Sequence, residues 1–390
     1  MSMPVLLAYA GFVLAGLSAG VSGVLLPAQI DDYGVDKAVI GLTFFAFAAG
    51  FLLAGAASGP LLHRIGMRAT LVLGGSAAVL SWLFLATRPV FVLFLAVQVT
   101  AGFGTGVIES VLNVYLTGLP NATTLLNRLH AFFGVGALIG PLLAAWMLGF
   151  TTWPMVWLVL AVVAMPVVVG YLLVYPRQEP PAEGEQRPGL LGRAARVPAV
   201  LFAGAFLTVY VGLEIGVGNW AYTLLTEEHG QGPLLAGWSV SAYWLGLTLG
   251  RFVISPVAGR VGLSAAGTSF VCLFGVTGAA LLGWVAPTGA VVSVALVVMG
   301  CFLGPLFPTA IAVLPDVVEP RLVPTAIGVV NGFSVLGGAL FPWLAGALAQ
   351  GVGVWTLLPF ATVLAVAQLV LWREVVTRMR IRQRPPGAPT

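Results

Sequence analysis

Apolar residues fill the chain in long runs, which alternate with short clusters of charged residues, Gly and Pro. A helix needs about 20 such residues to cross a hydrocarbon core. Twelve runs meet this requirement, and they are too long and too uniformly apolar for barrel strands. They lie near residues 5–28, 39–62, 70–87, 90–118, 124–149, 153–175, 198–226, 234–259, 264–285, 289–313, 322–349 and 354–373. The pattern predicts an all-α membrane protein with twelve transmembrane helices.

Composition supports this prediction and excludes other classes of protein. Hydrophobic residues make up 59% of the chain and charged residues 8%, whereas a soluble domain carries about 25% charge. The net charge of +4 is too small to indicate a nucleic-acid partner. Cysteine-pair, zinc-protease and phosphate-loop motifs do not occur, and the chain has only 2 Cys and 3 His. We therefore expect neither an enzyme nor a metal or cofactor site.

Basic residues divide unevenly between the two sides of the predicted membrane. If the first span starts in the cytoplasm, fourteen arginines fall on the cytoplasmic side and only Lys37 and Arg88 on the other. This bias predicts cytoplasmic N- and C-termini in the cytoplasmic membrane. A Pro-, Arg- and Glu-rich stretch interrupts the apolar pattern halfway along. The expected organisation is two six-helix bundles over 1–175 and 198–376, a cytoplasmic linker over 176–197 and a basic tail over 377–390.

The two halves repeat each other at an offset of 196 residues. The offset pairs Gly16 with Gly212, Asp31–Asp32 with Glu227–Glu228, and Pro60, Arg64 and Gly66 with Pro256, Arg260 and Gly262. Each half has an even number of spans, so the repeats run parallel. Such repeats place a cavity between them near the midplane.

A cytoplasmic loop motif resembles that of the major facilitator superfamily. The stretch GPLLHRIGMR after the second span contains Gly59, Arg64, Gly66 and Arg68, with His63 where the family usually has Asp. The resemblance extends over all twelve spans. It implies the major facilitator fold and a monomeric transporter in contact with the lipid bilayer.

Five further stretches are similar to the fucose-permease-like sugar/proton symporters. They are ESVLNVY (109–115), LNRLHAFFGVG (126–136), EIGVGNWAY (214–222), YWLGLTLGR (243–251) and GPLFPT (304–309). In that group an acid on the fourth span takes part in protonation and sugar binding, and Glu109 matches its position. The group also has an Asp in the first span, but residues 11–27 of this chain contain no carboxylate.

Three ionisable residues fall well inside predicted spans: Glu109, Glu214 and Arg251. A charge at the bilayer centre costs several kcal/mol, so such groups face a cavity or a partner. Glu109 and Glu214 are therefore the candidate proton-coupling residues. Arg251 lies about 13 Å deeper than Arg260 along a helix. It either extends towards the cytoplasm or pairs with a carboxylate.

Polar residues of the fourth span recur at helical spacing. Gln98, Gly102, Thr105, Glu109 and Asn113 form one stripe. The stripe could face a cavity that receives a hydroxylated solute, or it could hydrogen-bond neighbouring helices.

Other polar and aromatic residues are candidates for solute binding, with ordinary helix packing as the alternative for each. Asn219 follows Gly218 in a segment that we expect to be broken. Aromatic rings could stack on the apolar face of a sugar. The full set of solute-binding candidates is Gln98, Asn113, Tyr115, His130, Tyr210, Asn219, Trp220, Tyr243, Trp244 and Asn331. The candidate gating residues are Gly59, Arg64, Gly66, Arg68, Arg251 and Arg260.

These features predict a secondary transporter for a small neutral polar solute, a monosaccharide or polyol, driven by protons through alternating access. A drug/proton antiporter that exports lipophilic compounds is the main alternative, because the spans are rich in aromatic and aliphatic residues. A membrane sensor is the remaining alternative. Only 18 residues follow Trp372, which leaves little room for a signalling domain.

Overall fold

The computed structural model describes residues 2–175 and 190–383, and within these ranges the chain forms helices and no strand. The first bundle consists of α1 (Met3–Tyr33), α2 (Lys37–Ile40), α3 (Leu42–Ala86), α4 (Phe91–Thr117), α5 (Ala122–Leu148) and α6 (Trp153–Val174). We call it the N-terminal half. Residues 176–189 of the linker expected over 176–197 and residues 384–390 of the expected tail lie outside the described residues.

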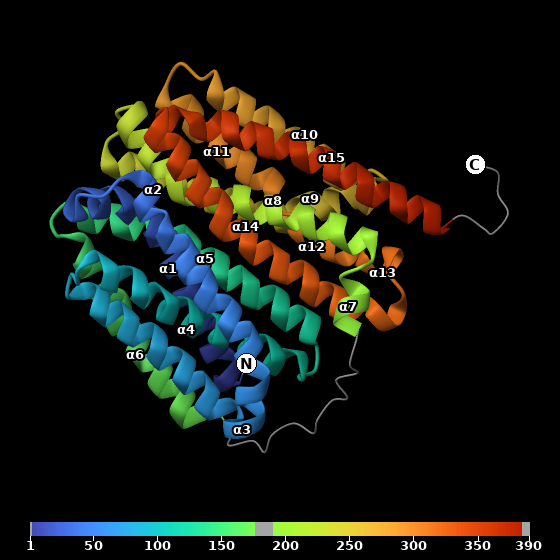
Figure 1. Cartoon of the computed structure of the whole chain (residues 1–390), viewed down its shortest axis with the longest axis horizontal. Coiled ribbons are helices and arrows are strands. Elements are labelled where there is room, and N and C mark those ends of the chain that lie inside the picture. The colour runs from blue at the N-terminus through green and yellow to red at the C-terminus, as the bar shows by residue number, and fades with distance from the viewer. Residues whose placement is uncertain (1, 176–189, 384–390) are drawn as a thin grey trace.

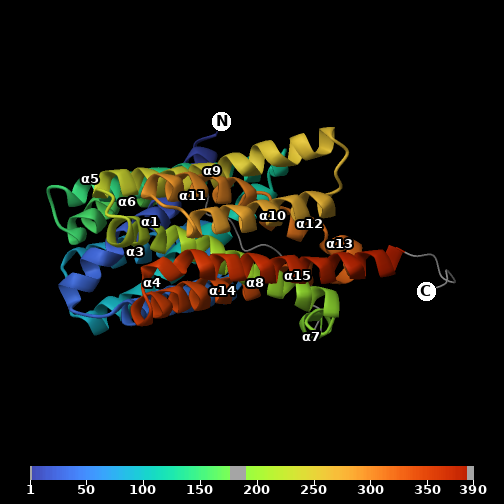
Figure 2. The same cartoon turned by 90° about the horizontal axis from the view of Figure 1, so that it is seen from above.

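The second bundle, the C-terminal half, packs beside the first (Figure 1, Figure 2). Its longer helices are α8 (Pro198–Thr223), α9 (Pro233–Arg260), α10 (Ala265–Trp284), α11 (Gly289–Leu303), α14 (Val323–Gly351) and α15 (Leu357–Gln383). Shorter pieces are α7 (Leu190–Ala194), η1 (Leu224–Glu228), α12 (Leu306–Ala312), α13 (Leu314–Val317), η2 (Pro320–Leu322) and η3 (Val354–Thr356). The basic tail, expected from residue 377, is helical up to Gln383.

Eleven helices of the described chain are long and apolar enough to span a membrane. One of them, over 37–86, has 50 residues and would be about 75 Å long if straight. It is not straight, because Gly66 has φ 75° and ψ 171°, a conformation that in practice only glycine adopts. Accordingly, Phe47, which precedes Gly66, and Ala78, which follows it, contact α4 at nearby positions. Phe47 lies against Gly102 and Ala78 lies against Gly104. The chain therefore doubles back at Gly66.

The helix expected over 289–313 is interrupted at Gly304–Pro305, between α11 and α12. Pro305 and Pro308 have no backbone N–H, so the carbonyls four residues earlier, at Cys301 and Gly304, lose their helical donors. The Gly304 carbonyl instead accepts a hydrogen bond from Arg251 Nε at 3.3 Å.

The break expected near Asn219 is absent. Helix α8 runs without interruption to Thr223 and continues as the π-helical turn η1. Its glycines serve close packing instead. A Cβ on Gly218 would lie 2.5 Å from the Trp244 ring.

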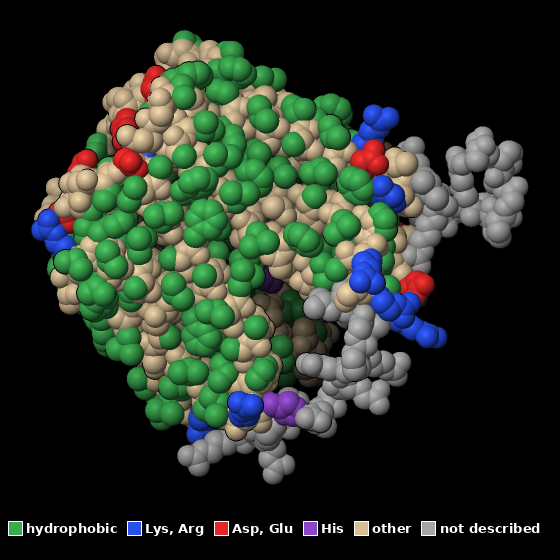
Figure 3. Space-filling view, in the orientation of Figure 1, with side chains coloured by type: hydrophobic (Ala, Val, Ile, Leu, Met, Phe, Trp, Pro, Cys, Tyr) green, Lys and Arg blue, Asp and Glu red, His purple; other side chains and the backbone are tan. Residues whose placement is uncertain are grey.

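The two ends of the bundles differ in charge (Figure 3). We call them the acidic end, with Asp31, Asp32, Asp36, Glu227 and Glu228, and the arginine-rich end, with Arg64, Arg128, Arg193, Arg260 and Arg321. Helix α1 begins and α15 ends at the arginine-rich end. Four exposed tryptophans lie near the acidic end: Trp146, Trp238, Trp284 and Trp355. Tryptophans at this level are typical of a membrane–water interface.

Candidate functional site

The two halves are in close contact from the middle of the bundle to the acidic end. Main chains of α1 and α8 approach so closely that a Cβ on Gly23 would lie 2.6 Å from Asn219 Cα. A Cβ on Gly237 of α9 would lie 3.2 Å from the Pro141 carbonyl oxygen of α5. Because glycine allows both approaches, the small residues close the seam between the halves at this end.

Lys37 of α2 adds a polar connection across the same end. Its Nζ lies 2.9 Å from Glu227 Oε2 in η1 of the other half. Its backbone N–H donates to Gln350 Oε1 of α14 at 3.0 Å, and Phe45 meets Trp343 with ring centroids 5.8 Å apart. We call Lys37, Glu227 and Gln350 the latch.

The arginine-rich end of the seam is open. Figure 3 shows a hollow between the halves on the side where most Lys and Arg atoms gather, with a histidine side chain inside it. His130 of α5 is exposed, and its ring meets Phe12 of α1 edge-on at 5.5 Å. Gly134, one turn further along α5, packs on Thr248 of α9. Since these helices run in opposite directions, His130 lies opposite Arg251 across the seam.

Glu214 of α8 and Arg251 of α9 form an ion pair within the membrane-spanning region. Arg251 Nη2 donates to Glu214 Oε1 at 3.4 Å, and the two side chains are 28% and 11% exposed. Pairing compensates two charges that would each be costly inside the bilayer. Of the two possibilities left open for Arg251, pairing is the one present in the structure.

Two tyrosines lie beside this pair. The Tyr243 hydroxyl donates to the Glu214 backbone carbonyl at 3.0 Å and ties α9 to α8. Tyr210, one turn before Glu214, is fully buried, and its hydroxyl has no hydrogen-bond partner among the described residues. Its ring packs on Phe307 of α12 with centroids 5.9 Å apart.

Glu109 of α4 is half-buried, and its carboxylate makes no ion pair or hydrogen bond with the described residues. Its backbone carbonyl accepts from the Asn113 amide at 2.8 Å. Gln98 is half-buried, and Tyr115 packs edge-on against Tyr175 at 5.1 Å inside the N-terminal half.

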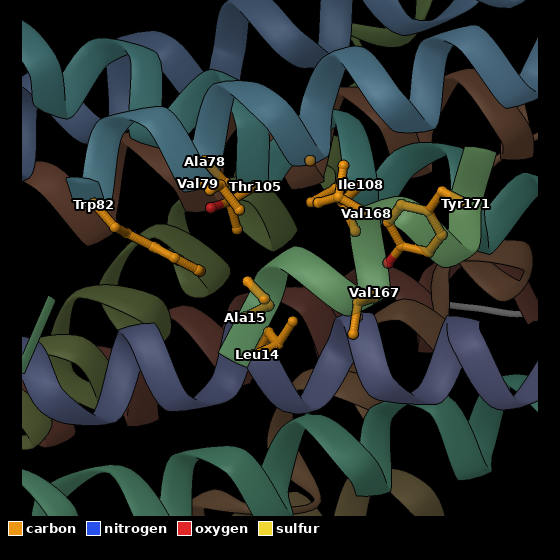
Figure 4. Close-up of a pocket in the computed structure, with 13 residues that line it drawn as sticks. Leu14, Ala15, Ala78, Val79, Trp82, Thr105, Ile108, Val167, Val168 and Tyr171 are labelled. Carbon is orange, nitrogen blue, oxygen red and sulfur yellow. The ribbon is translucent and has the colours of Figure 1, made fainter. Parts of the chain in front are cut away.

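The polar stripe on α4 faces partly into the N-terminal half. Gly102 packs on the main chain of α3 at Phe47. Thr105 lines a small apolar pocket of about 20 Å³ between α1, α3, α4 and α6, together with Trp82 and Tyr171 (Figure 4). This pocket lies within one bundle and not in the seam.

The aromatic residues considered for sugar stacking are buried in helix packing. Trp220 donates its indole N–H to the Pro342 carbonyl at 2.8 Å. Trp244 packs on Gly218, and Tyr243 is held by Glu214. Asn219 donates to the Ile215 carbonyl at 2.9 Å. By contrast, Asn331 of α14 is exposed.

Five of the six candidate gating residues lie at the arginine-rich end, and the sixth, Arg251, lies deeper in its pair with Glu214. Gly59, Arg64 and Arg260 are exposed, and Gly66 forms the turn within α3. Arg68 Nε donates at 2.5 Å to the carbonyl of Tyr175, which directly follows α6. This bond connects the turn to the end of the N-terminal half.

Sequence reasoning missed the latch. The repeated acidic doublets, Asp31–Asp32 and Glu227–Glu228, marked the right region. Nothing in the spacing indicated that Lys37 would cross to Glu227, because that contact depends on how the halves pack.

Comparison with known proteins places this architecture in a family. A Major Facilitator Superfamily profile matches residues 8–230 and 204–389. "Bypass of stop codon protein 6" of Saccharomyces cerevisiae is 25% identical over 88% of this chain and 76% of its own. A glucose/galactose transporter of Brucella abortus is 24% identical over 88% of this chain and 87% of its own.

Solved structures share the fold at low identity. The nucleoside transporter NupG, in a mutant form, has a TM-score of 0.81 at 13% identity, covering 97% of this chain and all of its own. A bacterial homologue of Spinster, inward-facing and unoccupied, has a TM-score of 0.76 at 15% identity over 99% and 98%. FucP in its outward conformation has a TM-score of 0.64 at 17% identity over 98% and 99%. The profile spans nearly the whole chain, and the chain belongs to the Major Facilitator Superfamily of transporters.

Proposed function

We propose that the protein is a proton-coupled secondary transporter that moves a small neutral polar solute, a monosaccharide or polyol, by alternating access. The observation that carries this proposal is the seam, which is open at the arginine-rich end, closed at the acidic end, and contains the Glu214–Arg251 pair. A cavity that reaches a membrane-embedded polar site from one side is what alternating access requires.

The proposed topology has twelve spans, counting the helix that doubles back at Gly66 as two. Both termini and the arginine-rich end are then cytoplasmic, by the positive-inside rule, and the protein works as a monomer in the cytoplasmic membrane. The hollow accordingly faces inward. In support, the inward-facing Spinster homologue has a higher TM-score than outward-facing FucP, 0.76 against 0.64, although it is less identical in sequence.

A neutral solute fits the charges near the seam. Glu214 and Arg251 compensate each other, so an uncharged solute leaves the pair intact, whereas a charged solute would compete for one partner. The glucose/galactose transporter among the relatives supports a sugar. Nucleosides contain a sugar, and the structural similarity to the nucleoside transporter NupG is the reason to include them in the test.

Glu109 is the proposed proton carrier. Its carboxylate has no partner among the described residues, and an unpaired carboxylate in a membrane span is stabilised by protonation. Solute is driven by the proton gradient only if protonation and solute binding favour each other.

A thermal-shift screen at two pH values tests the solute class. The panel contains monosaccharides, polyols, nucleosides and lipophilic cationic dyes. A ligand that binds the native state raises the apparent Tm with concentration. We expect shifts with one or more sugars or polyols. Shifts with dyes alone would contradict the proposal and favour a drug exporter.

A further inference from the structure

Among the described residues, buried polar atoms without a hydrogen-bond partner gather on two helices of the C-terminal half. On α8 and α9, such atoms belong to Tyr210, Asn219, Thr223, Ser241 and Trp244. Most buried polar groups in proteins are hydrogen-bonded, because an unsatisfied one is costly. The α8–α9 pair therefore has more hydrogen-bonding capacity than its helix packing uses, and Tyr210 is the member nearest to Glu214 along α8.

The Glu214–Arg251 pair also has unused capacity. A guanidinium has five N–H donors. Arg251 directs Nη2 to Glu214 and Nε to the Gly304 carbonyl, so three N–H groups remain. Glu214 Oε2 accepts no bond from the described residues. Donors and acceptors thus lie side by side, which suits a hydroxyl group that both donates and accepts.

Two features of the sequence, Pro308 and Gly304, hold the Arg251 guanidinium beside Glu214. Pro308 has no N–H for the Gly304 carbonyl, so that carbonyl is free to accept from Arg251. A Cβ on Gly304 would lie 2.7 Å from the Arg251 backbone nitrogen, so only glycine lets α9 approach α11 this closely. Arg251 is held by Glu214 of α8 and by the Gly304 carbonyl after α11, and its side chain is still 28% exposed.

We propose that Tyr210, Glu214 and Arg251 form the solute-binding group, which holds adjacent hydroxyls of a sugar or polyol on the C-terminal half. This inference rests on the proposed function and deepens it. It separates the roles of the two membrane carboxylates: Glu214 binds solute and Glu109 carries the proton. The pair provides both donor and acceptor to neighbouring hydroxyls without gaining or losing charge.

The chain offers a matched pair of variants for a test. Tyr210 and Tyr171 are 0% and 1% exposed, and neither hydroxyl has a partner among the described residues. Tyr210 lies beside Glu214, whereas Tyr171 lines the pocket inside the N-terminal half. Replacement by Phe removes only the hydroxyl from each.

The experiment measures the Kd of D-glucose and D-galactose by calorimetry in wild type, Tyr210→Phe, Tyr171→Phe and Glu214→Gln. Loss of one hydrogen bond weakens binding about 2- to 12-fold, and we expect this for Tyr210→Phe. Tyr171→Phe should retain the wild-type Kd. Glu214→Gln should raise the sugar Kd at least as much as Tyr210→Phe does. It should also slow sugar counterflow, an exchange in which no net proton moves. The apparent Tm without sugar checks that each variant folds.

The outcomes separate the inference from the proposed function. If wild type binds a sugar and folded Tyr210→Phe and Glu214→Gln bind it with unchanged Kd, the inference is overturned and the transporter proposal stands. Equal weakening by Tyr171→Phe and Tyr210→Phe also overturns it, since the effect is then not local to the pair. If wild type binds neither sugar but binds a dye, the proposed function fails and the inference fails with it.

Discussion

Lys37 is the only lysine in the chain, so its amine reports on the latch with little ambiguity. In the structure its side chain is 18% exposed and paired with Glu227, which is 40% exposed. If the halves separate at the acidic end during transport, Lys37 loses this partner and becomes reactive. The perturbation that tests this is Glu227→Gln, which keeps the amine and removes its charged partner.

The size of the effect follows from the exposure of the pair. A solvent-exposed ion pair contributes about 0.2–1 kcal/mol, and screening at 40% exposure keeps the latch within that range. This energy corresponds to a change of about 1.4- to 5-fold in the equilibrium between closed and open states. We therefore expect Glu227→Gln to raise the acylation rate of Lys37 by that factor.

The assay treats purified protein with an N-hydroxysuccinimide ester and follows Lys37 by peptide mass spectrometry. Glu228→Gln is the matched control, because it removes a neighbouring carboxylate that makes no ion pair with the described residues. High salt gives a second check. At about 1 M salt the Debye length is about 3 Å, so salt should speed labelling in wild type but not in Glu227→Gln. Equal rates in all three proteins at every salt concentration would refute the latch.

Three further variants test other parts of the account. Glu109→Gln should abolish proton-driven accumulation and leave counterflow exchange intact; unchanged pH dependence of uptake would remove Glu109 from coupling. Gly237→Val should prevent closure at the acidic end, since a Cβ at this position would lie 2.5 Å from the Ala145 Cβ of α5, and should therefore raise Lys37 labelling; wild-type labelling and transport would contradict this. Gly66→Ala should lower the apparent Tm, because a positive φ of 75° costs a non-glycine residue about 1–3 kcal/mol; an unchanged Tm would show that the turn tolerates a side chain.

The fold was largely predictable from the sequence because lipid and water impose a simple pattern on it. Hydropathy located the spans, and the turn at Gly66 fell in the charged loop expected between the second and third spans. The break at Gly304–Pro305 was not predicted, although the spacing of Pro305 and Pro308 contains its cause. The break expected near Asn219 was wrong, because the glycines there serve packing against Trp244.

The candidate site was only partly predictable. Glu214 and Arg251 were identified as charges within spans, but their ion pair depends on how α8 and α9 are aligned along their axes. The polar stripe on α4 had helical spacing, yet spacing does not say which neighbour the stripe faces. Thr105 faces a pocket inside its own bundle. The contact between Lys37 and Glu227 exists only where the two halves are closed against each other, so no local sequence pattern could predict it.

Uptake into proteoliposomes with an imposed pH gradient is the most direct measurement of proton-coupled sugar transport. Protein is reconstituted, radiolabelled D-glucose or D-galactose is added outside, and the external pH is lowered relative to the lumen. Proton-coupled transport predicts accumulation above the external concentration, collapse of that gradient by a protonophore, and loss of accumulation in Glu109→Gln. Sugar uptake that only equilibrates, at the same rate with and without the pH gradient, would contradict it.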